Sequence, residues 1–327
     1  MSTLKVSIVT NAKEETATFT KCIFSDEIEL LLQTESEMRN SIETINVLIP
    51  GHINVDAELI KNGTNLKMIH CGTGYNNIDI ETCNMNGIYV AVTPNVAAQS
   101  VAELVFACFL TLVKKIIIFD HMMKNGDWKI TDFIESPELK GKTLGIIGYG
   151  NIGKASAQIA RGFNMNLIAY DPHIKITDSD VSPVSFEYLL KKSDFITLHV
   201  LLTSETKGMI STPQFEMMKN NVIIANVCRG LVIDEAAITK ALMSNRIGGA
   251  CLDVFEKEPL AKNSILRQLN NVILTPHIGY CSNEALKRRF QFFADNCQRI
   301  LDGEKPKMVI NADAISYNKN FQKVNKE

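Results

Sequence analysis

The stretch Leu144-Gly145-Ile146-Ile147-Gly148-Tyr149-Gly150-Asn151-Ile152-Gly153 joins a short apolar run to a glycine-rich turn. A helical pattern, Lys154 to Phe163, follows, and a second apolar run, Leu167 to Tyr170, leads directly to the acidic residue Asp171. A strand, three spaced glycines, a helix and an acid about 20 residues further on form the fingerprint of a dinucleotide site. This stretch predicts an α/β domain that binds NAD.

Each residue of the glycine-rich turn has a physical role in this interpretation. Gly148 permits the tight turn from strand to helix, Gly150 lets the backbone approach the pyrophosphate, and Gly153 lets the helix pack closely on the strand. Asn151 and Ile152 begin the helix, whose N-H groups and positive end attract phosphate. These five residues are the predicted phosphate-binding part of the cofactor site.

Asp171 is the predicted selectivity residue. Its carboxylate is expected to accept hydrogen bonds from the adenosine ribose, and its charge repels the additional 2'-phosphate of NADP. The sequence therefore favours NAD.

Length and composition narrow the class of protein. A chain of 327 residues exceeds the size of one hydrophobic core, which predicts two domains. The net charge of -2 gives no basic excess to favour nucleic acid or an anionic membrane. The sequence shows neither a signal-peptide pattern at Met1-Ser2-Thr3-Leu4-Lys5 nor an apolar run of about 18 residues, so we expect a cytoplasmic location. The eight cysteines lack metal-ligand spacing, so we expect no metal site and free thiols.

Before the fingerprint, short apolar runs alternate with helical patterns, which predicts a parallel sheet covered by helices. The expected strands are Lys5 to Thr10, Asn46 to Pro50, Lys67 to Cys71 and Gly87 to Val92, with a helix over Val55 to Asn62. The pattern from Val96 to Ile118 predicts one long helix that joins two domains.

After the fingerprint the alternation resumes and completes a doubly wound domain. The expected strands are Phe195 to Leu198, Val222 to Val227, Gly249 to Leu252 and Val272 to Leu274, separated by helices over Glu187 to Lys192, Thr212 to Met218 and Glu235 to Asn245. A helix over Ser282 to Asp302 and a strand over Met308 to Ile310 are expected to return to the first domain, and the polar tail from Ala314 to fray. The predicted domains are residues 1–96 plus 285–327, and an inserted NAD-binding domain, 97–284.

Three chemically useful side chains follow the later strands, where ligands lie in open α/β sheets. They are Arg229, in Asn226-Val227-Cys228-Arg229-Gly230, Glu258, in Asp253-Val254-Phe255-Glu256-Lys257-Glu258-Pro259, and His277, in Thr275-Pro276-His277-Ile278-Gly279. A neutral imidazole can take the proton of a secondary alcohol during oxidation and return it during reduction. A carboxylate beside it favours the protonated ring, and a guanidinium can hold a substrate carboxylate and polarise the reacting oxygen.

The chain resembles the D-isomer-specific 2-hydroxyacid dehydrogenase family over nearly its whole length, because family patterns recur in order. They are Gly72 to Asp79, Ser100 to Glu103, Gly141 to Thr143, the fingerprint, Arg229 to Glu235, Leu252 to Pro259 and Thr275 to Gly279. The resemblance implies two α/β domains, one Rossmann-like and one flavodoxin-like, with a cleft between them. It also implies that Arg229, Glu258 and His277 are the catalytic residues.

Further site residues come from the resemblance alone. Asp253 is expected to contact the nicotinamide carboxamide, and the other expected cofactor contacts are His199, Val200, Val227 and Cys228. The turn Cys71-Gly72-Thr73-Gly74, together with Arg229, is expected to bind the substrate carboxylate. The resemblance also implies a homodimer, paired around the linking helix.

The substrate stays open among small acids: 3-phosphoglycerate, glyoxylate or hydroxypyruvate, and lactate-like acids. Asn76, Leu201 and Tyr280 depart from the family pattern, and Tyr280 is expected to narrow the pocket. His70 and Cys71 stand where phosphoglycerate-using relatives tend to carry arginine, which disfavours a phosphorylated substrate. The alternatives are an NAD-sensing protein that resembles the family's corepressors, and a formate or phosphite enzyme. Formate enzymes are expected to carry glutamine in place of Glu258, which disfavours formate.

Overall fold

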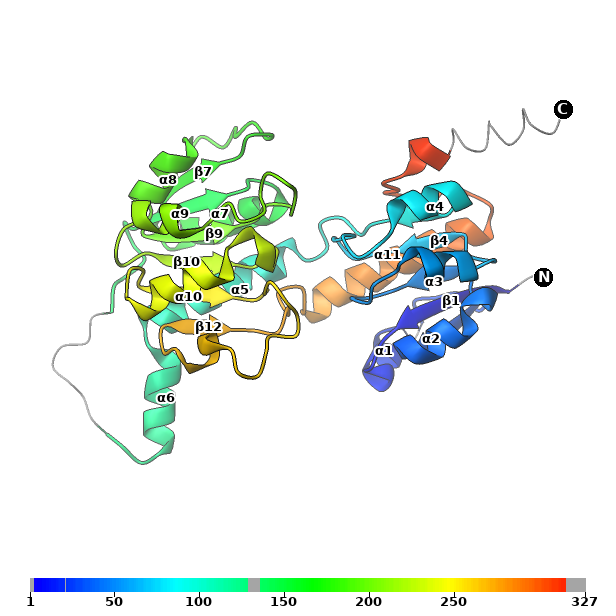
Figure 1. The fold of residues 1–327 in the computed structure, drawn as a ribbon, viewed down its shortest axis with the longest axis horizontal. Coiled ribbons are helices and arrows are strands. Elements are labelled where there is room, and N and C mark those ends of the chain that lie inside the picture. The colour runs from blue at the N-terminus through cyan, green and yellow to red at the C-terminus, as the bar shows by residue number, and fades with distance from the viewer. Residues whose placement is uncertain (1–2, 21, 129–135, 316–327) are drawn as a thin grey trace. The chain divides into compact units, whose positions relative to one another are not determined.

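The computed structural model describes residues 3–20, 22–128 and 136–315, and the chain divides into two compact units (Figure 1). Unit 1 combines residues 1–96 with residues 282–327, and unit 2 is the segment from Ala97 to Cys281. The second division follows Cys281, whereas the sequence placed it after residue 284. The assignment of substrate binding to one unit and cofactor binding to the other stays a prediction.

Unit 1 contains a five-stranded parallel sheet in the order β2-β1-β3-β4-β5, the order of flavodoxin-like domains. Its strands are β1 (Leu4–Val9), β2 (Ile28–Gln33), β3 (Val47–Ile49), β4 (Met68–His70) and β5 (Tyr89–Ala91). The sequence patterns did not predict β2. It is an edge strand in which only Ile28 is buried, so its apolar pattern is weak.

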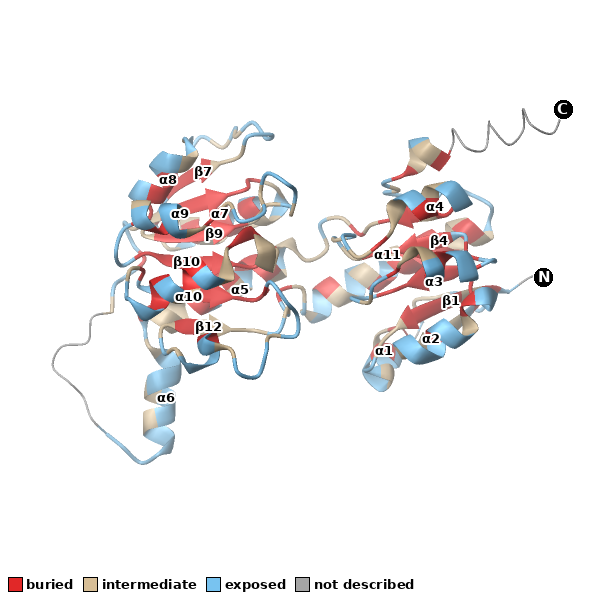
Figure 2. Ribbon diagram, in the orientation of Figure 1, coloured by how far each residue is buried: buried red, intermediate tan, exposed pale blue. Residues whose placement is uncertain are grey.

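Helices cover both faces of this sheet, because alternate residues of each strand point to opposite sides. Leu48 packs in the cluster beneath α2 (Glu35–Ser41), α3 (Ala57–Asn62) and α4 (Ile80–Asn86), together with the 3-10 turn Ile42–Thr44. Val47 and Ile49 pack on the other side with α1 (Lys13–Thr20) and α11 (Asn283–Leu301). In Figure 2 the buried residues follow the strands and the inner sides of the helices. A C-terminal helix therefore completes the core that the first strand begins.

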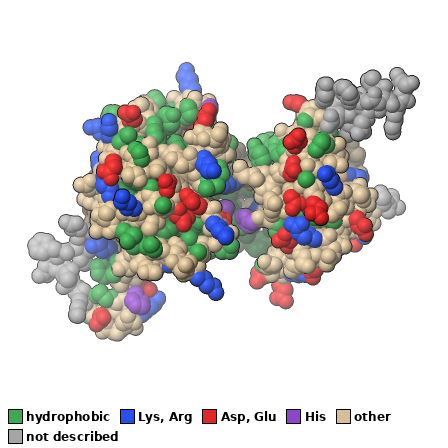
Figure 3. Space-filling model, in the orientation of Figure 1, with side chains coloured by type: hydrophobic (Ala, Val, Ile, Leu, Met, Phe, Trp, Pro, Cys, Tyr) green, Lys and Arg blue, Asp and Glu red, His purple; other side chains and the backbone are tan. Residues whose placement is uncertain are grey.

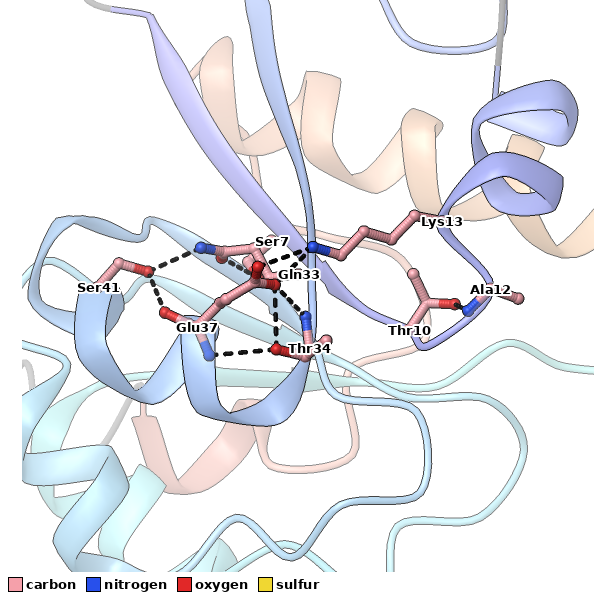
Figure 4. Close-up of polar contacts among 8 residues, drawn as sticks. All are labelled: Ser7, Thr10, Ala12, Lys13, Gln33, Thr34, Glu37 and Ser41. Atoms are coloured by element: carbon pink, nitrogen blue, oxygen red, sulfur yellow. Dashed lines mark hydrogen bonds and ion pairs between the residues drawn. The ribbon is translucent and has the colours of Figure 1, made fainter.

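Helix α2 begins with a reciprocal capping arrangement, drawn in Figure 4. The Glu37 carboxylate accepts hydrogen bonds from Lys13 Nζ at 2.6 Å and from the Thr34 backbone N-H at 2.7 Å. The hydrogen bond from Lys13, followed by those from Thr34, lowers the pKa of Glu37 to about 2. Beside them Ser7 donates to Gln33, and Gln33 donates to Ser41, so side chains join β1, β2 and α2.

Unit 2 contains a seven-stranded parallel sheet in the order β12-β11-β10-β9-β6-β7-β8. Its strands are β6 (Thr143–Ile147), β7 (Asn166–Tyr170), β8 (Val181–Pro183), β9 (Phe195–Leu198), β10 (Ile223–Asn226), β11 (Gly249–Leu252) and β12 (Val272–Leu274). Counted from β6, this is the 3-2-1-4-5-6 order of dinucleotide-binding folds with one additional edge strand. The fingerprint strand β6 therefore lies at the point where the strand order reverses. The sequence patterns did not predict the short strand β8.

The two faces of this sheet also have separate apolar cores. Helices α5 (Ala98–Val113) and α7 (Asn151–Gly162) cover one face, where Phe106, Phe109 and Leu144 pack. Helices α8 (Phe186–Lys192), α9 (Thr212–Met217) and α10 (Glu235–Met243) cover the other. Two 3-10 turns, Gly230–Val232 and Ile265–Gln268, complete the unit.

The single helix predicted from Val96 to Ile118 is wrong, because the structure has two helices there. Helix α5 ends at Val113, Lys115 adopts a left-handed conformation with φ of 51°, and α6 (Ile116–Lys124) follows. Val113 is the last residue of α5 that the core buries, and α6 buries none of its residues. Beyond Val113 the chain has no core surface to follow, so nothing favours continuing the helix in the same direction.

The strand predicted over Met308 to Ile310 is also wrong. The segment makes one isolated antiparallel bridge, Val309 to Ala91, beside the edge strand β5. Met308 has a φ of 54°, which interrupts an extended conformation. The tail expected to fray lies, from residue 316, outside the described residues.

On the face drawn in Figure 3, acidic and basic side chains are interspersed over both units. Within the described residues, no helix is long and apolar enough to span a membrane. The same part of the chain holds no group of three or more histidine, cysteine or acidic side chains placed to bind a metal ion.

Candidate active site

The glycine turn after β6 has the geometry that a bound pyrophosphate requires. Gly148 has a φ of +92°, and a Cβ there would lie 2.6 Å from the carbonyl oxygen of His199. A Cβ on Gly153 would overlap the Gly148 carbonyl, so this glycine lets α7 pack against the turn. A Cβ on Gly150 would meet no atom within 4 Å. The protein itself thus tolerates a side chain at Gly150, and open space lies where the resemblance places the phosphates.

Asp171 follows β7 and points toward this turn. Its Oδ2 accepts a hydrogen bond from the Tyr149 N-H at 2.8 Å, and its Oδ1 accepts from the N-H groups of His173 at 2.8 Å and Ile174 at 2.9 Å. Three backbone donors therefore fix the orientation of the carboxylate beside the first glycines. This is the position from which a carboxylate can receive ribose hydroxyls.

The other expected cofactor residues lie at the carboxyl ends of neighbouring strands. His199 and Val200 follow β9, and Val200 packs against Gly148. Val227 and Cys228 follow β10 and are buried. Burial raises the pKa of the Cys228 thiol to about 11, so this thiol stays protonated at neutral pH.

Arg229 lies in a turn that buried neighbours hold in place. Asn226 accepts hydrogen bonds from the N-H and thiol of Cys228 and donates to the Arg229 carbonyl at 3.0 Å. The Arg229 guanidinium is half-buried and donates to the Cys228 carbonyl at 2.6 Å. A Cβ on Gly230 would overlap the backbone of Phe255, so the Arg229 turn packs directly on the loop that carries Glu258.

Glu258 and His277 form a pair in unit 2. The His277 Nδ1 lies 2.8 Å from Glu258 Oε2, while Glu258 Oε1 accepts from the Phe255 N-H at 3.1 Å. The side chains are 27% and 37% exposed, so solvent and substrate can reach a pair that the backbone orients. The structure thus brings together two of the three predicted catalytic side chains and places Arg229 on an adjoining loop.

Asp253 organises the loop that carries His277. This buried carboxylate accepts hydrogen bonds from Thr275 Oγ1 at 2.6 Å and from the N-H groups of Ile278 at 2.8 Å and Gly279 at 2.9 Å. The His277 N-H donates to the Asp253 carbonyl at 2.8 Å, and His277 has a left-handed φ of 57°. The family resemblance implied that Asp253 contacts the nicotinamide, a role that stays a prediction. No sequence pattern indicated that Asp253 also holds the loop that carries His277.

The expected substrate loop lies in unit 1, after β4. Cys71 is buried in an apolar cluster, and burial raises the pKa of its thiol to about 12, so this thiol stays protonated at neutral pH. Within the described residues, the N-H groups of Gly72, Thr73 and Gly74 donate to no acceptor of the protein, and Thr73 is exposed. Three successive N-H groups on a surface loop can bind a carboxylate.

Arg289, which sequence reasoning missed, lies against this loop. Its Nη2 is 2.9 Å from the point where a Cβ on Gly72 would stand, and its guanidinium lies over the Phe293 ring, 5.5 Å from the centroid. A side chain at position 72 would therefore displace the end of the Arg289 side chain. No local pattern joins the two residues, since the packing of α11 on the sheet brings them together.

The geometry of a dinucleotide fold with an adjacent acid-base pair agrees with comparison to known proteins. The model of the D-isomer specific 2-hydroxyacid dehydrogenase NAD binding domain matches residues 106–279. The chain belongs to this family. It is thus an NAD-dependent 2-hydroxyacid dehydrogenase, an oxidoreductase that acts on CH-OH groups. The predicted family, the pair of doubly wound α/β domains and the cofactor are confirmed.

Several relatives of this dehydrogenase cover most of its length. Glyoxylate reductase of Thermococcus litoralis is 42% identical over 272 residues, which are 80% of this chain and 82% of the relative. D-3-phosphoglycerate dehydrogenase of Archaeoglobus fulgidus is 36% identical over 88% of this chain, which spans 55% of that longer protein. The crystal structure of Aquifex aeolicus D-lactate dehydrogenase with NAD and lactic acid shares 28% identity. Its TM-score is 0.80, and the match covers 92% of this chain and 96% of that one.

Proposed function

We propose that this dehydrogenase reduces a small 2-keto acid, glyoxylate or hydroxypyruvate, with NADH, and that it catalyses the reverse oxidation when the acid and NAD are in excess. The observation that carries this proposal is the pair formed by His277 and Glu258 in a unit with a dinucleotide-binding fold. The similarity to glyoxylate reductase supports this substrate class. Tyr280, whose ring lies 6.3 Å from that of His277, favours a narrow pocket.

In this proposal His277 exchanges the proton of the reaction. With its Nδ1 hydrogen donated to Glu258, the ring presents Nε2 to the substrate oxygen. During reduction the protonated ring gives the Nε2 proton to the oxygen at C2, while the bound cofactor supplies the hydride to C2. The Glu258 carboxylate, 2.8 Å away, stabilises the positive ring before the transfer.

Arg229 and the Gly72 to Gly74 loop serve the substrate carboxylate in this proposal. The guanidinium supplies paired donors and positive charge beside the oxygen that becomes the alkoxide, which stabilises the transition state. The N-H groups of the loop supply further hydrogen-bond donors, which do not ionise during the reaction. The glycine turn, Asp171 and the residues after β9, β10 and β11 hold the cofactor.

A phosphorylated substrate, 3-phosphoglycerate, is the second candidate. Arg289 favours it, because this cation stands at the loop where the sequence showed only His70 and Cys71. A guanidinium is well suited to bind phosphate. His70 cannot share that role, because burial lowers its pKa to about 3 and keeps the ring neutral.

A panel of 2-keto acids tests the proposal, with NADH consumption followed by absorbance. We expect turnover of glyoxylate and hydroxypyruvate, and a loss of at least about a thousandfold in His277→Ala and Arg229→Ala. Tyr188→Phe, an exposed change on α8, serves as the control. If no acid is turned over while NADH still binds, the NAD-sensing alternative replaces the enzyme.

The two substrate candidates separate in Arg289→Met, which keeps the length and apolar stem of the side chain. If phosphohydroxypyruvate is the substrate, its KM rises roughly tenfold or more, as expected on losing one charged contact. Glyoxylate kinetics should change little, since this acid carries no second anionic group. An equal change for both acids would assign Arg289 to the support of the loop.

We further propose that the protein is a homodimer joined through α6. This helix buries none of its residues in the chain and stands apart from the sheet in Figure 1. Ile116, Ile117, Ile118 and Met123 are 47–57% exposed, and Trp128 beyond it is 74% exposed. Such a concentration of exposed apolar side chains is typical of an association surface. A cytoplasmic location, expected from the sequence, stays a proposal that cell fractionation tests.

A further inference from the structure

Tyr149 stands between the first two glycines of the fingerprint, and its side chain is fully buried. Its backbone N-H donates to Asp171 Oδ2 at 2.8 Å, and its phenol donates to Asp178 Oδ2 at 2.7 Å. Asp171 and Asp178 belong to the same loop, which follows β7. One residue of the phosphate-binding turn therefore holds this loop at two points.

Arg161, on α7, strengthens the second of these points. Its Nη2 lies 3.1 Å from Asp178 Oδ2 and 2.8 Å from Asp180 Oδ1, and its Nε pairs with Asp180 Oδ2. The hydrogen bond from Tyr149, followed by that from Arg161, lowers the pKa of Asp178. The Asp178 carboxylate therefore stays ionised, and a hydrogen bond to a charged acceptor is stronger than one between neutral groups.

The loop itself supplies little other anchorage. Residues 172–175 are exposed, and of the residues between Asp171 and Asp178 only Ile176 packs against the core. The N-H groups of His173 and Ile174 orient the Asp171 carboxylate, but these two hydrogen bonds lie within the loop and do not connect it to α7 or β6. The Tyr149 phenol and Arg161 provide that connection.

We propose that Tyr149 is a positioning residue for cofactor selectivity, acting through Asp178 to fix the loop that carries Asp171. The proposal rests on the predicted role of Asp171 at the adenosine ribose. A fixed carboxylate receives the ribose hydroxyl of NADH and repels the 2'-phosphate of NADPH at a constant distance. A loop released from α7 can turn the carboxylate away, which weakens NADH binding and relieves the penalty on NADPH.

Tyr149→Phe tests this proposal, because it removes the phenol oxygen and keeps the buried ring. We expect the Kd for NADH, measured by fluorescence titration, to rise roughly threefold to tenfold, less than the full effect of one hydrogen bond to a charged group, because the lost bond acts on the cofactor only through the loop. The Kd for NADPH should rise less or fall, and amide hydrogen exchange across residues 171–180 should accelerate. Tyr188→Phe, on the surface of α8, should change none of these values.

A double-mutant cycle shows whether the phenol acts through Asp171. In an Asp171→Ala background, Tyr149→Phe should leave the ratio of NADH to NADPH affinity unchanged. Equal weakening of both cofactors by Tyr149→Phe, or an undiminished effect without Asp171, would overturn the proposal. If Asp171→Ala alone leaves the ratio unchanged, the role of Asp171 is itself wrong and the proposal falls with it. Asp178→Asn, which removes the charge from the acceptor, repeats the test if Tyr149→Phe does not fold.

Discussion

Asp253 shows how one buried side chain can control a catalytic loop at the residue scale. Its two carboxylate oxygens accept three hydrogen bonds from the loop between Thr275 and Gly279. We predict that Asp253→Asn lowers kcat by roughly tenfold to a hundredfold, because an amide cannot accept all three bonds and a small misplacement of His277 is costly. Steady-state kinetics with saturating NADH measure the loss.

Thr275→Val distinguishes loop support from cofactor contact, because it removes one of the three bonds and keeps the carboxylate. A smaller fall in kcat in this variant, with an unchanged Kd for NADH, agrees with loop support. If Asp253→Asn weakens NADH binding while Thr275→Val changes neither kcat nor the Kd for NADH, the carboxylate contacts the nicotinamide, as the family resemblance implied.

His70 predicts a dependence of stability on pH. Its Nδ1 donates to the Cys71 carbonyl and its Nε2 accepts from Asn296, so the folded ring is neutral, and burial lowers its pKa from 6.5 to about 3. Between these values the unfolded chain binds a proton that the folded chain does not. The free energy of unfolding should therefore fall as the pH falls through this range, by about 1.4 kcal/mol per pH unit for this group.

Urea unfolding at several pH values between 4 and 7 measures this slope. The slope should become shallower in His70→Gln and stay unchanged in His173→Gln, where the histidine is exposed. Parallel curves for the wild type and His70→Gln would show that His70 does not contribute.

The sequence indicated Arg229, Glu258 and His277 because each follows an apolar strand and stands in a recognisable run of neighbours. The contact of His277 with Glu258 was expected from chemistry, whereas the support from Asn226 and Asp253 depends on backbone turns that no spacing shows. Arg289 could not be predicted as a neighbour of Gly72. Its helix has to pack on a sheet formed by the other end of the chain before the two residues meet.

At the scale of the element, the glycines of the turn after β6 differ in what requires them. Packing within the fold requires two of them, and the bound cofactor is expected to require the third. Gly148→Ala and Gly153→Ala place a Cβ against backbone, so both variants should lose stability as well as cofactor binding. Gly150→Ala meets no protein atom, so its Tm should match the wild type while its Kd for NADH rises roughly tenfold or more.

Gly162→Ala is the matched control, since that glycine ends the same helix and its Cβ also meets no atom within 4 Å. Calorimetry measures the Tm of each variant, and fluorescence titration measures its Kd for NADH. Unchanged NADH affinity in Gly150→Ala would place the pyrophosphate away from this turn.

Strands whose residues are mostly apolar were easier to predict than edge strands with polar residues. The patterns indicated β9 and β11 with their observed bounds, because short buried strands read as near-continuous apolar runs. They also indicated β12, an edge strand whose three residues are all apolar. They missed β2 and β8, which are edge strands that bury one residue each and contain polar residues. They also missed the break before α6, because Ile116 to Ile118 look like further core although the chain leaves them exposed.

For the whole molecule, the exposed isoleucines of α6 predict an assembly that depends on this helix. We expect Ile117→Glu to shift the protein toward the monomer, because burying the new charge at a subunit interface is unfavourable. Sedimentation measures the change. Ile265→Glu, at a comparably exposed apolar residue outside α6, should leave the mass unchanged. A monomeric wild type, or equal behaviour of the two variants, would contradict the proposed interface.

Unit 1 takes its core from both ends of the chain, because Phe290, Phe293 and Cys297 of α11 pack with Leu4 and Val6 of β1. On the ribosome, the first strands emerge long before the helix that covers them, whereas unit 2 is one continuous segment. The nascent chain should therefore finish unit 2 while the N-terminal sheet still exposes one apolar face, a state prone to aggregation. The part of the protein that is translated first is the part that finishes folding last.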